Sequence, residues 1–418
     1  MESFIQDEII NHFTSNNMLA DEQHGFIIGR SCITQLISTL EEWTAILDNG
    51  GQVDAIYMDF MKAFDKVPHE RLLHKLEGYG VKGNVLKWIR SFLCHRTQKV
   101  VVCGSQSDWA EVTSGIPQGT VLGPTLFLAY INDLPQTTSS PIVLFADDTK
   151  AFRQINGVTD CLELQADLNK LQDWANKWQM KFHPEKCRVL RMGSNPPPFE
   201  YPMTENNITT TLEVSPVEKD LGVLVDHRLK FKQHITATIN KGNQMLGLIR
   251  RSFQHLDSQN MLLLYKGMVR PILEYGNTIW YPHLKQDIVA TEAIQRRATK
   301  LIPELRDLSY EDRLRRLSLP TLAHRRLHGD MINVYKYLHG KYSVKRHPFK
   351  MANRKTTRGH ALKLQKQYSR LDLRKFFFTN RVVEAWNALP DHVVLAPTLN
   401  AFKNKFDKHW QNVFSFDY

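Results

Sequence analysis

Two apolar segments in the first half of the chain run directly into aspartates, and this pattern constrains the fold most. In PIVLFADDTK, residues 142–146 can line a buried strand and lead into Asp147 and Asp148. In AIYMDFMKAFDKVP, a second strand-like run ends at Asp59. A buried carboxylate costs several kcal/mol unless a cation or hydrogen bonds compensate. We therefore expect a positive partner where these strands end.

That partner is predicted to be a pair of metal ions. If the two strands pair in one sheet, Asp59 and Asp147 meet at one edge, an arrangement that holds two divalent cations about 3.5 to 4 Å apart. Oxygen ligands without a His or Cys cluster favour Mg²⁺ over zinc, with Mn²⁺ as a substitute. Asp148 is the third predicted metal ligand, but consecutive strand residues point to opposite faces, so we expect unequal roles for Asp147 and Asp148. A solvated hairpin tip is the alternative for such an Asp pair.

Three neighbouring features favour a site over a solvated turn. SGIPQGTVLGPTLFLAYINDL places glycines in a loop that leads into an apolar helix, with Pro124 suited to its first turn. Phe64 lies five residues after Asp59 and either walls a sugar pocket or packs in the core. Lys186 follows the amphipathic segment LQDWANKWQMKF, which could bring a cation to the carboxylates.

The two halves of the chain differ in periodicity and in charge. Strand-like QVDAIYMDF, helix-like HERLLHKLEGYG and strand-like QKVVVCG alternate upstream, whereas MLLLYKGMVRPILEYG, TEAIQRRATKLI and YEDRLRRLSL have helical spacing downstream. Residues 193–202, GSNPPPFEYP, form the one clear candidate for a linker. Residues 1–220 carry about −9 charges and residues 221–418 about +20, which suits metal chemistry in the first part and a phosphate backbone in the second. A generic basic surface is the alternative.

Further features describe the class of protein. No apolar run reaches membrane-spanning length, and the first residues, MESFIQDEII, are acidic, so we expect a soluble intracellular protein. The five cysteines have no metal or redox spacing and are predicted to be free thiols. RKFFFTNRVVEAWNAL alternates aromatic and basic residues, which we interpret as a core helix with solvated cations rather than a surface for base stacking.

Taken in order, four segments resemble the reverse transcriptase of non-LTR retrotransposons (LINE elements) of the jockey-like type. They are YMDFMKAFDKVPHERLLHKL, SGIPQGTVLGPTLFLAYINDL, FADDTK and KDLGVLVDHRLKFKQHI, and the ordered set is highly specific. QRRATKLIPELRDLSYEDRLRRLSLP and RVVEAWNALP also resemble the region after the polymerase core of such elements.

The resemblance implies an α+β right-hand polymerase that catalyses RNA-directed DNA synthesis. Partial fingers and a palm, with an antiparallel sheet and helices, are expected over residues 1–192. A linker and a primer-grip-like hairpin, DLGVLVD, are expected over 193–235, and a basic helical thumb and C-terminal region over 236–418. The implied partners are an RNA template, a DNA primer and dNTPs, with no membrane, and the implied location is the nucleus.

The resemblance also assigns roles by position. Asp59 and Asp147 match the metal ligands, with Asp148 a less direct neighbour and Lys186 the lysine that protonates pyrophosphate. The predicted substrate-binding residues are Phe60 through its carbonyl, Phe64 as the sugar gate, Gln118, Gly119 and Arg30.

Departures from the family leave an alternative open. The basic fingers segment that precedes the HGFIIGRSC block in relatives is missing, as is the N-terminal endonuclease, so we expect an N-terminally truncated copy. Ile27 stands where many relatives carry arginine, and His183 replaces the usual asparagine before Lys186. The alternative is a catalytically inactive remnant that binds nucleic acid. A metal-dependent hydrolase unrelated to polymerases would leave the ordered motifs unexplained.

Overall fold

The computed structural model describes residues 1–205, 208–253, 256–352 and 359–411. The chain divides into two compact units. Unit 1 comprises Met1–Gln35 and Gly50–Pro216, and unit 2 comprises Leu36–Asn49 and Val217–Tyr418. The division falls after residue 216, so the proline-rich segment 193–202 belongs to unit 1.

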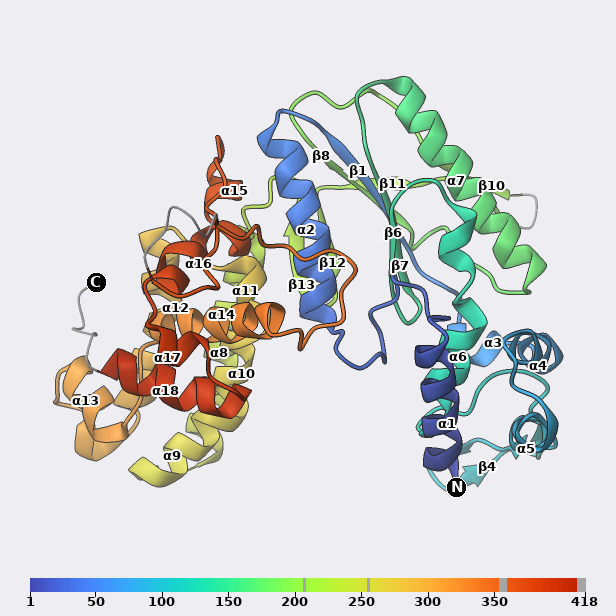
Figure 1. Ribbon diagram of the computed structural model, residues 1–418. Coiled ribbons are helices and arrows are strands. Elements are labelled where there is room, and N and C mark those ends of the chain that lie inside the picture. The colour runs from blue at the N-terminus through green and yellow to red at the C-terminus, as the bar shows by residue number, and fades with distance from the viewer. Residues whose placement is uncertain (206–207, 254–255, 353–358, 412–418) are drawn as a thin grey trace. The chain divides into compact units, whose positions relative to one another are not determined.

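Unit 1 is built on a five-stranded sheet with the order β11-β8-β1-β7-β6 (Figure 1). Every neighbouring pair is antiparallel except β11 and β8, which are parallel. The central strand is the expected QVDAIYMDF segment, and the FADD segment forms the expected hairpin. The strands are β1 (Val53–Met58), β6 (Ile142–Phe145), β7 (Asp148–Gln154), β8 (Arg188–Met192) and β11 (Glu213–Ser215).

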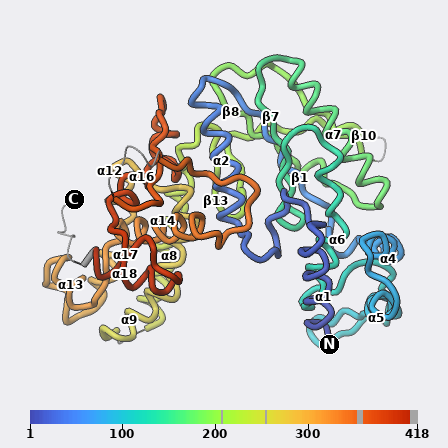
Figure 2. Tube along the Cα trace, viewed as in Figure 1, coloured from blue at the N-terminus to red at the C-terminus, as the bar shows by residue number. Residues whose placement is uncertain are grey.

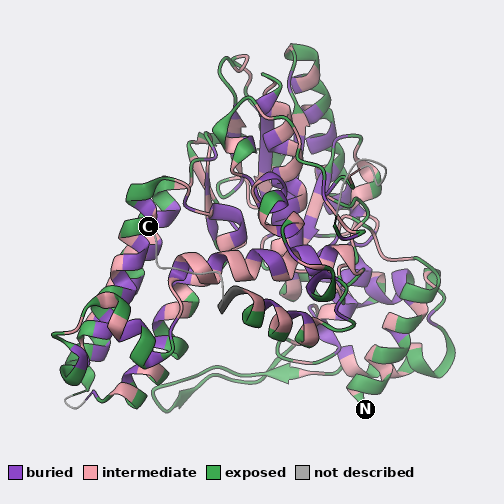
Figure 3. Ribbon diagram, turned by 60° about the vertical axis from the view of Figure 1, so that its left-hand side comes forward, coloured by how far each residue is buried: buried purple, intermediate pink, exposed green. Residues whose placement is uncertain are grey.

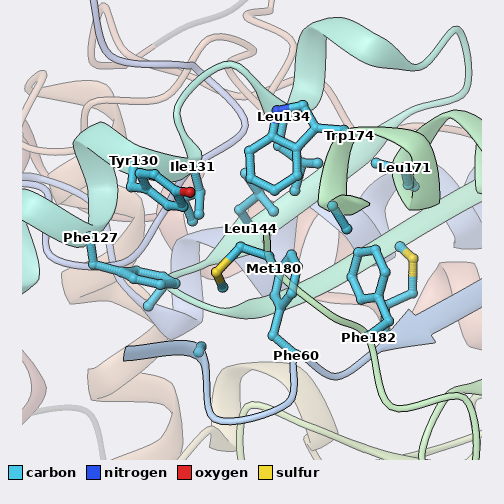
Figure 4. Close-up of a cluster of buried hydrophobic side chains, with 14 of the residues drawn as sticks. Phe60, Phe127, Tyr130, Ile131, Leu134, Leu144, Leu171, Trp174, Met180 and Phe182 are labelled. Carbon is cyan, nitrogen blue, oxygen red and sulfur yellow. The ribbon is translucent and has the colours of Figure 1, made fainter. Parts of the chain in front are cut away.

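Helices pack against one face of this sheet, and Figures 1 and 2 show α6 and α7 running along it. Alternate residues of the β1 segment, Ile56, Met58 and Phe60, face this side and are buried. Helix α6 is mostly apolar and all of its residues except Pro124 are buried, with Pro124 in the first turn as expected. Figure 4 shows the resulting cluster around Phe60, Phe182 and Trp174. The helices are α1 (Glu2–Ser15), α3 (Ala63–Lys66), α4 (His69–Gly78), α5 (Gly83–Leu93), α6 (Gly123–Ile131), η1 (Leu134–Thr137) and α7 (Val158–Lys177).

The strand expected in QKVVVCG is shorter than predicted and belongs to an exposed hairpin. Val100, Val101 and Val102 are each more than half exposed, and since consecutive strand residues point to opposite faces, neither face of this ribbon is buried. Three successive valines also lack the alternation that buries one face of a strand. The short strands of unit 1 are β2 (Thr97–Gln98), β3 (Val101–Val102), β4 (Ser105–Gln106), β5 (Ala110–Glu111), β9 (Pro202–Glu205) and β10 (Ile208–Thr211).

Segment 193–202 is extended and contains no helix, as its prolines predict. It is packed rather than free, because Tyr201 is 1% exposed and its hydroxyl donates to Asp54 Oδ2 over 2.8 Å. Asp54 also forms a buried ion pair with Arg191 of β8. Segment 193–202 is therefore part of the packed structure of unit 1.

Unit 2 is mainly helical, as the spacing of its apolar residues predicts. Its DLGVLVD segment lies in an antiparallel hairpin of β12 (Val217–Asp220) and β13 (Val223–Asp226), with Asp220 paired to Val223. The segment around Pro271 contains a π-helical turn, a way for a helix to accommodate a residue that lacks an amide proton. The helices are α2 (Cys32–Asp48, whose first residues belong to unit 1), α8 (Lys232–Ser252), α9 (Ser258–Leu264), η2 (Tyr265–Val269), α10 (Arg270–Glu274), α11 (Asn277–Trp280), α12 (Lys285–Lys300), η3 (Pro303–Leu305), α13 (Tyr310–Leu317), α14 (Leu322–Leu338), α15 (Asp372–Lys375), α16 (Phe378–Asn387), α17 (Asp391–Val394) and α18 (Leu399–Gln411).

The aromatic and basic segment RKFFFTNRVVEAWNAL does form a core helix, but the prediction that its cations are solvated is wrong for two of them. The Arg381 side chain is 9% exposed, and its guanidinium lies 2.9 Å from the buried Asp330 carboxylate. Arg374 is also buried, and its guanidinium pairs with Glu41 over 2.5 Å. A carboxylate from another element compensates each buried charge, which a pattern local to one helix cannot reveal.

Two smaller predictions about the class of protein can be compared with the structure. All five cysteines are free thiols, as predicted. Within the described ranges, no helix is long and apolar enough to cross a membrane.

Figure 3 shows buried residues concentrated in the strands and along one side of many helices, the arrangement expected of amphipathic elements. The predicted α+β class is confirmed.

Candidate active site

The register of the sheet gathers the predicted acidic residues at one edge of unit 1. Met58 pairs with Thr149 of β7, and Tyr57 pairs with Arg188 of β8. Continuing the β1–β7 register by one residue sets Asp59 opposite Asp148. On the other side of β1, the turn at residues 184–186 before β8 brings Lys186 to Asp59. Three segments far apart in the sequence therefore converge where β1 ends.

Lys186 forms an ion pair with Asp59, whose Oδ2 lies 3.3 Å from Lys186 Nζ. Backbone hydrogen bonds hold the two segments in place for this contact: His183 N donates to the Asp59 carbonyl (2.9 Å), and Lys186 N donates to the His183 carbonyl (2.8 Å). The Lys186 side chain is 63% exposed and that of Asp59 is 40% exposed. Such a solvated pair contributes little to stability, so both groups can exchange this contact for another.

Asp147 occupies the two-residue turn of the β6–β7 hairpin, next to Ala146. Burial, followed by the Asp59 carboxylate, raises the pKa of Asp147 above its ordinary value. A half-buried carboxylate beside a second one is the arrangement that a cation relieves. Asp148 is the exposed first residue of β7, so the two adjacent aspartates have different surroundings.

The donor set fits a hard divalent cation. Among the described residues, no group of three or more His, Cys, Asp or Glu side chains is arranged to hold a metal. Mg²⁺ does not require such a group, because it commonly binds one or two carboxylates and completes its shell with water and substrate phosphates. The carboxylates of Asp59 and Asp147 are oxygen donors of this kind.

Phe60 lies in the core directly after Asp59. Its side chain is 3% exposed and stacks on Phe182, with ring centroids 4.3 Å apart (Figure 4). The flanking hydrogen bonds use Met61 N, which donates to the Lys181 carbonyl, and the Asp59 carbonyl. The ring of Phe60 therefore anchors the backbone that carries Asp59, and only its carbonyl is a candidate ligand.

Phe64 is half-buried and stacks on Phe127 of α6, with centroids 4.4 Å apart and planes 18° apart. One face of the ring is thus committed to packing, while part of the residue stays accessible. This placement suits both a packing role and a wall beside a ligand, so the sugar-gate role stays a prediction.

The loop with Gln118 and Gly119 docks on the segment that follows β1. Gln118 Nε2 donates to Asp65 Oδ1 over 2.9 Å, and Ile116 N donates to the Phe64 carbonyl over 2.8 Å. A Cβ on Gly115 would lie 2.7 Å from the Asp65 carbonyl oxygen, so the close approach requires glycine. Gly119 has a φ of 78° and open space where a side chain would stand. Asp65 therefore holds this loop, and Gln118 and Gly119 are both exposed.

Arg30 faces its own loop. Its Nη1 donates to the carbonyls of Ala20, Asp21 and Gln23 over 2.8, 3.0 and 2.7 Å, and its Nη2 lies 3.3 Å from Asp21 Oδ1. Burial lowers the pKa of the guanidinium. These contacts organise residues 20–23, and the predicted substrate contact of Arg30 stays a prediction.

One residue that sequence reasoning missed contacts the β6–β7 hairpin directly. Gln23 lies just before the HGFIIGRSC block, is 3% exposed and bonds to the backbone of Ala146. A polar residue two positions before a glycine, in a stretch without helical spacing, was the available signal, but glutamine is common in such loops.

Comparisons with known proteins agree with the ordered motifs. The profile of the family described as "Reverse transcriptase (RNA-dependent DNA polymerase)" matches residues 1–228. The chain is 27% identical over 320 residues to "Probable RNA-directed DNA polymerase from transposon X-element" of Drosophila melanogaster, which covers 72% of this chain and 34% of that protein. It is 27% identical over 299 residues to "RNA-directed DNA polymerase from mobile element jockey" of the same organism, which covers 67% of this chain and 31% of that protein.

The chain thus spans about a third of the length of these relatives. Among solved structures, telomerase from Candida albicans in complex with a telomeric RNA fragment aligns with a TM-score of 0.41 and 12% identity, over 73% of this chain and 56% of that one.

Proposed function

Because the chain belongs to the reverse transcriptase (RNA-dependent DNA polymerase) family, we propose that it catalyses RNA-directed DNA polymerisation at the edge formed by Asp59 and Asp147. The substrates would be dNTPs, a DNA primer and an RNA template. The observation that carries the proposal is the convergence of Asp59, Asp147 and Lys186 from three segments, with Lys186 Nζ 3.3 Å from Asp59.

In this proposal the primer 3′-hydroxyl attacks the α-phosphate of the dNTP, and pyrophosphate leaves. Asp59, Asp147 and the Phe60 carbonyl would hold two Mg²⁺ ions, which supply electrostatic stabilisation of the charge on the reacting phosphate. Asp148, which is exposed, would change the electrostatic potential at the two ions. Lys186 would hold the proton at Nζ that pyrophosphate needs as it departs.

Substrate selection is proposed for residues around this edge. Gln118 and Gly119 lie exposed on a loop that Asp65 fixes, which suits contact with the template and the incoming nucleotide. The accessible part of Phe64 would clash with a ribose 2′-hydroxyl. DNA synthesis on an RNA template of a mobile element also suggests the nucleus as the site of action.

Primer extension on poly(rA)/oligo(dT) with the purified chain tests the activity. Wild type should extend the primer in Mg²⁺ or Mn²⁺, and Asp59→Asn and Asp147→Asn should both abolish extension while the fold is kept. Asp148→Asn should be milder. Extension by Asp147→Asn at the wild-type rate would refute the assignment of the metal ligands.

A second candidate function is a nucleic-acid-binding remnant without polymerase activity. It is favoured by the position of Arg30, since the remaining cation of the HGFIIGRSC block bonds to its own loop carbonyls. The surplus of basic residues after residue 220 would still bind a phosphate backbone. Binding of the RNA–DNA hybrid without any extension would support this candidate over the first.

A further inference from the structure

The turn that carries Asp147 has a backbone conformation that its sequence does not favour. Phe145 pairs with Asp148, so Ala146 and Asp147 form a two-residue hairpin loop. Ala146 has a φ of 55°, in the left-handed region, where glycine or asparagine is the usual choice in such loops. Contacts from outside the hairpin must therefore hold Ala146 in this conformation.

Gln23 supplies those contacts through its side-chain amide. Its Oε1 accepts from Ala146 N over 2.9 Å and from Gly25 N over 2.7 Å, and its Nε2 lies 3.5 Å from the Ala146 carbonyl oxygen. Two backbone amides converge on one atom of the side chain, so that atom must be the oxygen, and the orientation of the amide follows. Gln23 thus bonds to the backbone of Ala146 on both sides of its Cα.

The segment around Gln23 is itself fixed to the hairpin. Leu144 N donates to the Glu22 carbonyl over 2.9 Å, and His24 N donates to the Leu144 carbonyl over 2.8 Å. A Cβ on Gly25 would lie 2.5 Å from Ala146 N, so the two backbones touch and only glycine fits. Gln23 therefore forms a parallel β-bridge with Leu144, and Gly25 touches the turn itself.

We propose that Gln23 is a positioning residue for the polymerase site, which fixes the left-handed turn at Ala146 and thereby the orientation of the Asp147 carboxylate. The proposal deepens the proposed function and rests on Asp147 being a metal ligand there. Gln23 itself touches neither substrate nor metal. It acts through the peptide groups on either side of Ala146, so its loss should displace Asp147 without removing any ligand.

The test compares Gln23→Met with Gln35→Met in the full chain. Gln35 is also a buried glutamine of unit 1 (2% exposed), and its Oε1 has no hydrogen-bond partner among the described residues, which makes it a matched control. Gln23→Met should lower kcat for primer extension on the order of 100-fold, because a small displacement of a catalytic group has an effect of this size. The same variant should also bind Mn²⁺ more weakly. Gln35→Met should leave both close to wild type.

A rescue experiment separates positioning from general stability. Ala146→Gly removes the steric cost of the left-handed turn, so Gln23→Met/Ala146→Gly should recover at least about tenfold of the lost kcat. Amide hydrogen exchange at Ala146 should be slow in wild type and Gln35→Met and fast in Gln23→Met. A Gln23→Met variant with wild-type exchange at Ala146, or one that Ala146→Gly does not improve, would overturn the proposal.

Failure of the proposed function has a different signature. Suppose that wild type does not extend a primer and that its Mn²⁺ binding is the same as that of Asp147→Asn. The polymerase assignment and the positioning role of Gln23 are then both refuted. If wild type binds Mn²⁺ through Asp147 without extending a primer, the polymerase assignment alone fails. Hydrogen exchange and Mn²⁺ affinity then decide the role of Gln23.

Discussion

Acidification below pH 6.5 should loosen the segment that carries Gln23, because the adjacent His24 is buried as a neutral imidazole. Only 5% of His24 is exposed, and its Nδ1 lies 3.1 Å from Thr34 Oγ1. The Thr34 hydroxyl already donates to the Ser31 carbonyl over 2.8 Å. His24 Nδ1 must therefore be the donor, and the buried Nε2 is the atom that would take up a proton.

The size of the effect follows from the surroundings of this ring. Burial, followed by the charges of Arg30 and Lys150, lowers the pKa of His24 from 6.5 to about 3. The unfolded chain then binds one more proton than the folded chain between these values, so the free energy of unfolding falls as pH drops through this range. At about 1.36 kcal/mol per pH unit, the loss is roughly 2 kcal/mol at pH 5 and roughly 4 kcal/mol at pH 3. Above pH 6.5 the residue adds no pH dependence.

Hydrogen exchange of residues 20–26 and 142–149 at pH 7 and pH 5, corrected for intrinsic rates, measures this effect locally. Wild type should lose protection in both segments at pH 5, and His24→Gln should keep it, because glutamine retains a donor but does not titrate. His74→Gln, which changes an exposed histidine of the same unit, is the control and should behave as wild type. Equal loss of protection in wild type and His24→Gln would refute the reasoning.

Asp147→Asn should raise the free energy of unfolding at neutral pH, because burial and then the charge of Asp59 raise the pKa of Asp147, so its ionised form is the costly one. The gain should shrink as pH falls and the wild-type carboxyl protonates, and urea titrations at pH 7 and pH 4 measure the difference. Phe64→Val should reduce discrimination between dNTP and rNTP in extension assays, whereas an unchanged ratio with both rates lowered would make it a packing residue. Arg381→Met should cost about 3–5 kcal/mol in urea unfolding, because it leaves the buried Asp330 charge without its partner; a change below about 1 kcal/mol would contradict the burial of this pair.

Much of unit 1 could be predicted from local sequence. The strand before Asp59, the hairpin at Asp147 and the helix that begins near Pro124 each depend on residues a few positions apart, since backbone geometry repeats every two residues in a strand and every 3.6 in a helix. The order of the motifs along the chain was sufficient to indicate the family. The helices of the second half followed from the same periodicity.

The contacts between distant segments were decided by the tertiary structure. The pairing of β1 with β8 brings Lys186 to Asp59, although 127 residues separate them in the sequence. Arg381 looked like a surface cation because its helix alone does not reveal Asp330 on α14. Register and packing against other elements fix such contacts, and neither is encoded in a window of neighbouring residues.

The turn at Asp147 depends both on local sequence and on contacts with a distant segment. The sequence determined that a hairpin would present an aspartate there, because two apolar runs separated by the short polar segment DDTK favour this geometry. Its conformation was decided by Gln23, 123 residues away from Ala146, whose amide bonds to a backbone that alanine alone would not favour. A left-handed alanine is unfavourable in isolation and becomes stable only when folding brings those hydrogen bonds to it.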